Sequence, residues 1–384
     1  MNSPRHIPAL TGIRAIAAGM VFFGHVLHDH RGSLPIVFEY GWTGVNVFFA
    51  LSGYLFTYLY SDKLLDGTFV WSDYIKRRII RIYPLTTLLV LTVVLSQWGQ
   101  HSAKDVILHL TLLHSWFPDY RHSIISPMWT LTLEESYYFS APLLIYVMGL
   151  FYGDIDERTK DSTPSKRIIL LLLLSFALLL CTIAFANGSV RLYQDVLKYC
   201  TERWDSGAFT FTIFGRIVDF VAGMLAASIA RRVLPKGKFM GDLIVMVGCI
   251  AFIWGLYWMD GAGGPDKFGI HKLGLFIKYS IGIASAMVIY GLHAGGVFTR
   301  ILGSKPMVVL GEVSFALYLV QLMPFLWWPI IGMQLQINLE RAGLHYYSAS
   351  FIAYIVLNLV SMAIYYAFER PVGRYLRTRF LAGR

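Results

Sequence analysis

A pair of adjacent carboxylates stands inside one of the most apolar stretches of this chain. Residues 128–139 read MWTLTLEESYYF and continue as SAPLLIYVMGLF, so Glu134 and Glu135 fall about one turn inside a sequence typical of a membrane helix. An ionisable side chain in such a place is costly, and it marks a functional site whose partner has to be identified. Adjacent helical positions differ by about 100°, so periodicity leaves open which of the two carboxylates faces the protein core.

The stretch LTGIRAIAAGMVFFGHV carries two candidate partners, Arg14 and His25. Eleven residues bring a helix about 20° past three turns, so both side chains face the same way, about 16 Å apart along the axis. A carboxylate beside a histidine fixes its tautomer and stabilises the imidazolium, which makes an oriented general base. We expect Glu134 at the depth of His25 and predict that the two pair. An ion pair of Glu134 with Arg14 is the alternative, but the opposite depths of their positions argue against it.

Further polar side chains are expected at the level of His25 and would line a chamber around it. Asn46 enters this level through GWTGVNVFFALSGY, whose glycines permit close helix approach. Ser52, Tyr318 and Gln321 fit either a chamber or ordinary hydrogen bonds between helices. The remaining candidates come from the carboxylate-bearing stretch itself: Trp129, Thr130 and Tyr138.

A second group of charges is expected at the opposite boundary of the membrane. In DYIKRRIIRIYP, Arg78 and Arg81 are three residues apart on one helix face, and Arg77 is adjacent. Arg14 and Glu369 should lie at a similar depth. Converging guanidinium groups suit a phosphorylated ligand, because arginine binds phosphate through paired N–H donors. Basic residues at such a boundary are also common topology signals, and Lys76 and Arg77 fit that interpretation as well.

The composition sets the class of protein. Of the 384 residues, 56% are hydrophobic and only 15% are charged, with a mean hydropathy of +0.56. This predicts an all-α, polytopic integral membrane protein, with residues 1–384 forming a single domain. The net charge of +10 does not indicate nucleic-acid binding, because no soluble basic face is present to hold it. The three cysteines have no metal-ligand spacing, so no metal site is predicted.

About ten membrane spans follow from the apolar windows. The shorter stretch 104–117 is expected to be interfacial or re-entrant. Lys and Arg number about 20 in the segments on one side and about 9 on the other, which places both termini in the cytoplasm. The predicted spans are 9–28, 41–60, 80–98, 129–151, 168–187, 209–230, 239–258, 273–293, 306–332 and 346–368.

Six segments together resemble membrane acyltransferase family 3. Members of that family open with an LDGLRAIA-like run ending in His and contain GVDLFFVLSGFL-like and WSLSVEEQFY-like segments. The matching segments occur here in the family's order, from residue 10 to about 374, and are specific as a set: LTGIRAIAAGMVFFGHV, GVNVFFALSGYL, RRIIRIYP, MWTLTLEESYYF, VSFALYLVQ and FERPVGR.

The resemblance implies transfer of an acyl group, usually acetyl, from cytoplasmic acyl-CoA to a hydroxyl of a sugar or related acceptor. It implies a location in the bacterial inner membrane, acyl-CoA as donor substrate, and no permanently bound cofactor. It makes His25 the catalytic base, Glu134 rather than Glu135 its partner, Arg14 a required residue, and Arg78 and Arg81 contacts of the donor phosphates.

Two positions depart from the family pattern. Asn46 replaces an Asp, which removes a negative charge near His25, and Gln321 replaces a His, which argues against a mechanism with a second histidine. Longer members of the family append a soluble esterase-like domain, which we expect this chain to lack. The connections at about 99–128 and 188–208 are expected to shape the choice of acceptor.

Direct attack of the acceptor on the thioester competes with a two-step route through an acyl-enzyme on His25 or Ser52. The rival class of function is a proton-coupled transporter or exporter of a glycan or small metabolite, because intramembrane His, Glu and Arg also build proton relays. An inactive binding relative is a third reading.

Overall fold

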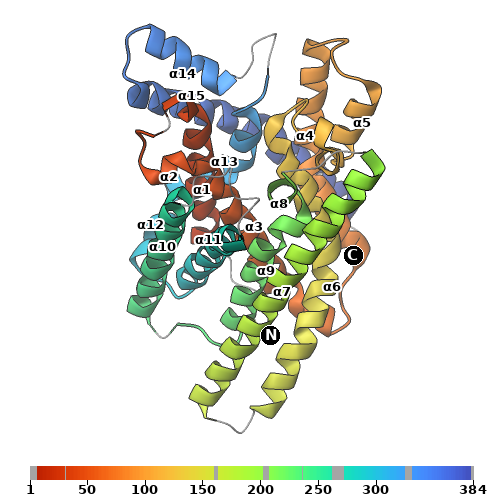
Figure 1. Cartoon of the computed structure of the whole chain (residues 1–384), viewed down its shortest axis with the longest axis vertical. Coiled ribbons are helices and arrows are strands. Elements are labelled where there is room, and N and C mark those ends of the chain that lie inside the picture. Colours follow the sequence, from red (N-terminus) through yellow and green to blue (C-terminus); the bar gives the residue numbers. More distant parts are fainter. Residues whose placement is uncertain are drawn as a thin grey trace. The chain divides into compact units, whose positions relative to one another are not determined.

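The computed structural model describes residues 7–30, 32–159, 163–201, 207–235, 237–261, 272–324 and 331–381, and side chains throughout these ranges except at 200–201 and 272–278. Helices connected by turns make up the described part, which contains no strand (Figure 1). This agrees with the all-α class predicted from the composition.

The chain divides into two compact units, each assembled from separate stretches of sequence. The first unit comprises Met1–Ile13, Val45–Phe69 and Phe139–Met307. The second unit comprises Arg14–Gly44, Val70–Tyr138 and Val308–Arg384. Four of the described helices have residues in both units: α1 (Pro8–Val26), α3 (Gly44–Leu65), α6 (Trp129–Arg158) and α13 (Lys305–Val320). The single-domain organisation stays a prediction.

Within the described residues, seven helices are long and apolar enough to cross a membrane. Each falls on a predicted span, as expected for an integral membrane protein; the count of ten and the cytoplasmic termini stay predictions. The seven are Pro8–Val26, Trp71–Ser96, Ser126–Arg158, Pro164–Tyr199, Ile213–Ala230, Lys238–Gly261 and Tyr346–Leu381.

The first unit is held together by close approach of its helices. Its core contains α9 (Ile213–Ala230), which packs against α7 (Pro164–Thr201) and α11 (Lys272–Leu292), and α11 packs in turn against α10 (Lys238–Gly261) (Figure 1). A Cβ on Gly223 of α9 would lie 1.8 Å from the Ala50 carbonyl oxygen of α3 (Gly44–Leu65). Glycine therefore lets the backbones of α3 and α9 touch. The short helices α8 (Ala208–Phe211) and α12 (Val297–Leu302) complete this unit.

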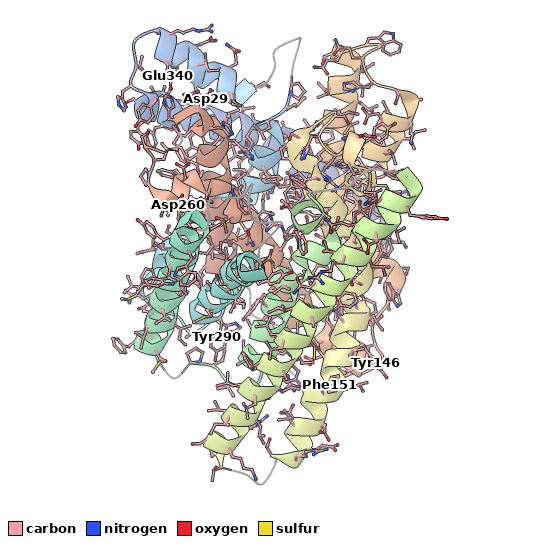
Figure 2. All side chains as sticks on the ribbon, viewed as in Figure 1. Asp29, Tyr146, Phe151, Asp260, Tyr290 and Glu340 are labelled. Carbon is pink, nitrogen blue, oxygen red and sulfur yellow. The ribbon has the colours of Figure 1, made fainter. Side chains whose placement is uncertain are left out.

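Many of the exposed side chains are large and apolar, as expected of a lipid-facing surface. Figure 2 shows Tyr146 and Phe151 on α6, and these side chains are 48% and 49% exposed. Tyr152, next in sequence, is instead 1% exposed and exchanges a hydrogen bond of 2.6 Å with Ser175 of α7.

The second unit places the C-terminal half of α1 against the segment that follows it. A Cβ on Gly41 would lie 2.1 Å from the Met20 carbonyl oxygen, so only glycine permits this contact. The unit also contains α2 (Ile36–Glu39), α4 (Trp71–Ser96), α13 (Lys305–Val320), α14 (Ile331–Arg341), α15 (Tyr346–Ile364) and α16 (Arg370–Leu381).

A π-helical turn, Tyr365–Glu369, joins α15 to α16 without a break. Such turns insert one residue into a regular helix and are frequent at functional sites. Glu369 is the last residue of this turn, and its side chain is 7% exposed. Glu369, the carboxylate predicted at the inner boundary, therefore stands on π-helical and not α-helical backbone.

Two boundary predictions need correction, and a third agrees with the structure. The span predicted at 306–332 is not continuous, because α13 ends at Val320 and a turn follows at 321–322. The connection predicted at 188–208 is helical as far as Thr201, since α7 is 38 residues long. The stretch 104–117 does not form a span: α5 (Ala103–Leu110) is short and 3₁₀ turns follow, as predicted.

Candidate functional site

The second unit gathers charged residues from α1, α4, α6 and the π-helical turn, and we call these residues the arginine cluster: Arg14, Arg78, Arg81, Glu134 and Glu369. Arg81 donates a hydrogen bond from Nη1 to Glu369 Oε1, and its guanidinium lies 5.3 Å from the centre of the Phe315 ring. The charges of Arg14 and Glu369 also interact. The structure thus unites the inner-boundary residues that the sequence placed at similar depth.

Aromatic rings enclose the neighbouring guanidinium of Arg78. Its central carbon lies 5.5 Å from the ring centre of Tyr74 and 5.1 Å from that of Tyr138. The Tyr74 hydroxyl donates to the Tyr138 carbonyl at 2.8 Å, which fixes α4 against α6. An arginine held over aromatic rings keeps its N–H groups in the plane of the guanidinium, away from the ring faces.

Glu134 belongs to the arginine cluster. The Tyr138 hydroxyl, one turn later on α6, donates a hydrogen bond to Glu134 Oε1. Glu134 interacts electrostatically with Arg14. Arg14 also interacts electrostatically with Arg81 and Tyr138. The depth argument did not predict this charge interaction, although an ion pair of Arg14 with Glu134 stays an alternative. It compared backbone positions, whereas both side chains reach several ångströms along their helices.

Glu135 has a different environment from its neighbour. Its side chain is hydrogen-bonded to Tyr83 of α4. The two carboxylates therefore point to separate partners, as the 100° between adjacent helical positions requires. This supports a structural role for Glu135 between α4 and α6.

His25 lies in the last turn of α1 and is partly exposed. Because α1 is a continuous helix through Arg14 and His25, the two positions are separated by about 16 Å along its axis, as predicted. The pairing of His25 with Glu134 stays a prediction.

Several predicted chamber residues meet at the start of α6. The hydroxyls of Thr130 and Tyr318 both donate to the Pro127 carbonyl, at 3.0 and 3.3 Å. Gln321, fully buried, donates to the Tyr318 carbonyl at 3.1 Å. Trp129, the first residue of α6, is 9% exposed beside them. The Tyr318 hydroxyl thus links α13 to the start of α6, and the chamber around His25 stays a prediction.

Asn46 takes part in a buried network that the sequence analysis missed. It donates to Asp219 Oδ2 at 3.0 Å and accepts from Arg216 Nη1 at 3.2 Å, and all three residues belong to the first unit. Each is at most 2% exposed. Asn46 stands where the family pattern has an aspartate, and here the Asp219 side chain places a carboxylate within hydrogen-bond distance of position 46. The signal was available: IFGRIVDFVAGM places Arg and Asp three residues apart inside a predicted span.

Ser52 and Arg77 have less distinctive surroundings. Ser52 lies within α3 and is of intermediate exposure. Arg77 is exposed on α4, unlike Arg78 beside it. This position fits the topology signal that was the alternative interpretation for Arg77.

The connection between α4 and α6, predicted to shape acceptor choice, is organised by histidines. Asp105 contacts His101 and His109 at 3.3 and 3.1 Å and accepts from the Ser123 hydroxyl at 2.7 Å. The rings of His109 and His114 stack with centres 4.0 Å apart, and both are fully buried. Burial lowers the pKa of each below its usual value. No group of three or more His, Cys, Asp or Glu among the described residues could hold a metal ion.

Comparison with known proteins identifies the family. A model described as an acyltransferase domain matches residues 7–370, nearly the whole chain. The chain belongs to membrane acyltransferase family 3. Both helix α1, with Arg14 and His25, and the arginine cluster lie inside the matched range or at its edge.

Family 3 relatives include O-acetyltransferases. The chain is 23% identical over 340 residues to the O-acetyltransferase OatA of Staphylococcus aureus, covering 83% of this chain and 50% of that protein. It is 25% identical over 390 residues to YrhL of Bacillus subtilis, a candidate peptidoglycan O-acetyltransferase, covering 96% of this chain and 55% of YrhL. Over 156 residues it is 30% identical to the acyltransferase MdmB of Streptomyces mycarofaciens, covering 36% of this chain and 38% of MdmB.

The chain spans about half the length of the OatA and YrhL proteins it matches. No solved structure matches it.

Proposed function

We propose that this protein is a membrane O-acyltransferase that moves an acetyl or other short acyl group from cytoplasmic acyl-CoA to a hydroxyl of a carbohydrate. Family membership and the O-acetyltransferase relatives support the reaction class. The name of YrhL, which specifies peptidoglycan, supports a carbohydrate acceptor. The family's bacterial relatives and the apolar helices support a location in the inner membrane.

The observation that carries the donor assignment is the arginine cluster. Three guanidiniums and two carboxylates meet among helices apolar enough to span a membrane, so a net positive charge is concentrated there. Acyl-CoA carries phosphates, which guanidinium groups bind through paired N–H donors. In this proposal Arg78 and Arg81 hold the donor phosphates, while Glu134 and Glu369 keep the arginines in place before the donor binds.

His25 serves as the general base in the proposed reaction. It removes the proton from the acceptor hydroxyl, and the hydroxyl oxygen attacks the thioester carbonyl carbon. The carbon–sulfur bond then breaks, coenzyme A leaves as the thiol with that proton, and the acyl ester remains on the acceptor. The rise of about 16 Å from Arg14 to His25 is comparable to an extended pantetheine arm, so a donor held by its phosphates at one end could present its thioester at the other.

The test of the base uses purified protein with acetyl-CoA, a bacterial glycan acceptor and detection of released thiol. His25→Ala should lower the rate by about 10²–10⁴-fold, the usual contribution of a general base. His28→Ala is the matched control, because His28 follows α1 closely and its side chain is 56% exposed. A His25→Ala protein that folds normally and retains near wild-type transfer contradicts the mechanism. Absence of acetyl-CoA-dependent thiol release from the wild type favours the transporter class instead.

The test of the donor site measures coenzyme A binding and acceptor binding separately. Arg78→Ala combined with Arg81→Lys should weaken coenzyme A binding at least about tenfold, since charge-assisted hydrogen bonds are lost, and leave acceptor binding little changed. Lys76→Ala, two residues away on the exposed face of α4, is the control. Equal losses for donor and acceptor would place the arginines outside the donor site.

A further inference from the structure

A second set of arginines surrounds a cavity that the proposed acyl transfer does not use. The cavity has a volume of about 320 Å³, and all of its lining residues belong to the first unit. We call it the arginine cavity. It lies between the C-terminal parts of α3 and α9, the second half of α6 and the start of α7. Its charged lining consists of Arg167, Arg231, Arg232, Asp62 and Asp156.

The aspartates hold the guanidiniums in position without using all of their donors. Asp156 accepts from both Arg167 Nη2 and Arg232 Nε at 2.8 Å. Arg231 donates to Asp62 and to the Tyr58 carbonyl, the latter at 3.0 Å. Each guanidinium has five N–H donors. These contacts therefore orient each group and leave some of its N–H donors for another hydrogen-bond acceptor. Three arginines against two aspartates leave the lining with a net positive charge.

Hydroxyl groups without partners face the same cavity. Thr57 and Ser61 line it from one side of α3, one helical turn apart, and are 2% and 8% exposed. Among the described residues, neither hydroxyl has a hydrogen-bond partner, and neither does the buried Nε of Arg167. Buried polar groups without partners are costly, so their presence points to a missing hydrogen-bond acceptor.

The unsatisfied groups are all able to donate, and the net charge is positive, so the missing species carries acceptor oxygens and negative charge. A phosphate group fits this chemistry. The helix ends around the cavity carry KR at 166–167 and RR at 231–232, which the distribution of basic residues places on the cytoplasmic side. Basic pockets between membrane helices on that side bind anionic lipid headgroups.

We infer that the arginine cavity binds a phosphate-bearing ligand, supplied by the headgroup of an anionic phospholipid or by a soluble phosphate compound. Thr57, Ser61 and Arg167 supply hydrogen bonds to the phosphate oxygens. Arg231 and Arg232 supply charge. The inference does not depend on the acyl transfer proposed above, because it concerns a separate set of residues.

Binding is measured on the purified full chain in two arms. In the first, phosphatidylglycerol is titrated into detergent-solubilised protein and counted by native mass spectrometry, with phosphatidylcholine for comparison. In the second, inorganic phosphate and coenzyme A are titrated in a phosphatidylcholine nanodisc and followed by thermal unfolding. The test variant is Thr57→Val with Ser61→Ala, which removes two hydroxyls that have no hydrogen-bond partner in the described part of the chain and should therefore leave the fold intact. Ser285→Ala is the matched control, because that buried hydroxyl bonds its own helix at Ile281 and is not part of the cavity lining.

The double variant should bind at least about tenfold more weakly in one arm, because each hydrogen bond to a charged group contributes substantially to affinity. Arg167→Gln should show a similar loss, while Ser285→Ala should match the wild type within about twofold. A loss confined to phosphatidylglycerol identifies a lipid headgroup, and a loss confined to inorganic phosphate or coenzyme A identifies a soluble ligand. If neither arm distinguishes these variants from the wild type, the cavity holds water only and the inference is overturned.

Discussion

The arginine cluster of the second unit and the arginine cavity of the first have the same formal inventory, three arginines with two carboxylates, yet their surroundings differ. In the cluster, Arg78 is stacked between the rings of Tyr74 and Tyr138, and Glu134 is held by Tyr138. In the cavity, Arg232 also lies over one ring, that of Tyr152 at 4.7 Å, but the three arginines border open volume and the hydroxyls of Thr57 and Ser61. Two rings fix the orientation of the Arg78 guanidinium, whereas the open side of the cavity presents hydrogen-bond donors that have no partner among the described residues and that a ligand can satisfy.

The two regions contain the same kinds of charge, so the role of an arginine between membrane helices depends on the groups around it and not on its charge alone. The acids make the same point. Glu369 is 7% exposed beside Arg81, whereas Asp62 is 49% exposed beside Arg231. A buried partner neutralises a charge that water cannot reach, while an exposed one mainly orients it.

The largest effect is expected from removing the buried acid. Glu369→Gln should lower the free energy of unfolding by about 2–3 kcal/mol, because Arg81 and Arg14 lose the carboxylate that compensates their charge. This loss is smaller than for a fully buried pair, because solvent partly screens Arg81. Asp62→Asn should cost less than about 1 kcal/mol. Denaturant unfolding in detergent micelles measures both. Equal losses would show that the two regions are electrostatically alike.

A matched pair of tyrosines tests the role of charge in each region. Tyr138→Phe removes a hydrogen bond to a carboxylate and should cost about 2 kcal/mol of unfolding free energy. Tyr152→Phe, which lines the arginine cavity, removes a hydrogen bond to the neutral Ser175 hydroxyl and should cost about 1 kcal/mol. Both residues are at most 5% exposed, so burial does not separate them. The reverse order would contradict an ionised Glu134.

Acid should weaken the second unit more than the arginine cavity, whose lining contains no histidine. Burial holds the pKa of His109 and His114 below the usual value, so the folded state keeps both neutral while the unfolded state takes up protons. Stability is therefore unaffected well above pH 6.5 and falls as the pH drops below it. At pH 5.5 the loss should reach about 1 kcal/mol for each histidine.

Hydrogen exchange at pH 7.5 and 5.5 measures this effect. Amides of Ala103–Leu110 should exchange faster at the lower pH, after correction for intrinsic rates, while those of α9 should not. A His109→Gln, His114→Gln protein should lose the pH dependence. Protection of Ala103–Leu110 that is independent of pH in the wild type would show that these rings do not titrate on unfolding.

The smallest effect is expected from Thr57→Val with Ser61→Ala in the absence of ligand. The change in unfolding free energy should stay within about 0.5 kcal/mol or be slightly stabilising, because no hydrogen bond among described residues is lost. A loss above about 2 kcal/mol would mean that these hydroxyls have structural partners. The measurement also provides the baseline for the ligand titrations.

The sequence was sufficient to predict those features of the structure that depend on a single property of a single segment. Apolar windows located the helices, and the length of the stretch 104–117 excluded a span. The predictions were wrong or incomplete where a second segment decides. The end of α13 at Val320 lies inside the run 313–333, whose one strongly polar residue is Gln321, so hydropathy averaged over a window gives no signal for it. The network of Asn46 depends on Arg216 and Asp219 from another helix.

The arginine cluster illustrates the same limit at the level of single side chains. Arg78 and Arg81 were identified because they share a face of α4, which spacing alone determines. Their contacts with Tyr138 and Glu369 depend on how α6 and the π-helical turn pack against α4, which spacing does not encode. Periodicity could not choose between Glu134 and Glu135; the structure distinguishes them by their partners, Tyr138 and Tyr83.

The π-helical turn at Tyr365–Glu369 makes the last helix intolerant of length changes. Its additional residue rotates Glu369 by about 100° from the direction that a regular α-helix would give it. Deleting one residue there would restore ordinary backbone geometry, yet would swing the carboxylate off Arg81. The π-helical turn and the ion pair of Arg81 with Glu369 therefore depend on each other. A relative with a one-residue deletion at this turn would be expected to lack both.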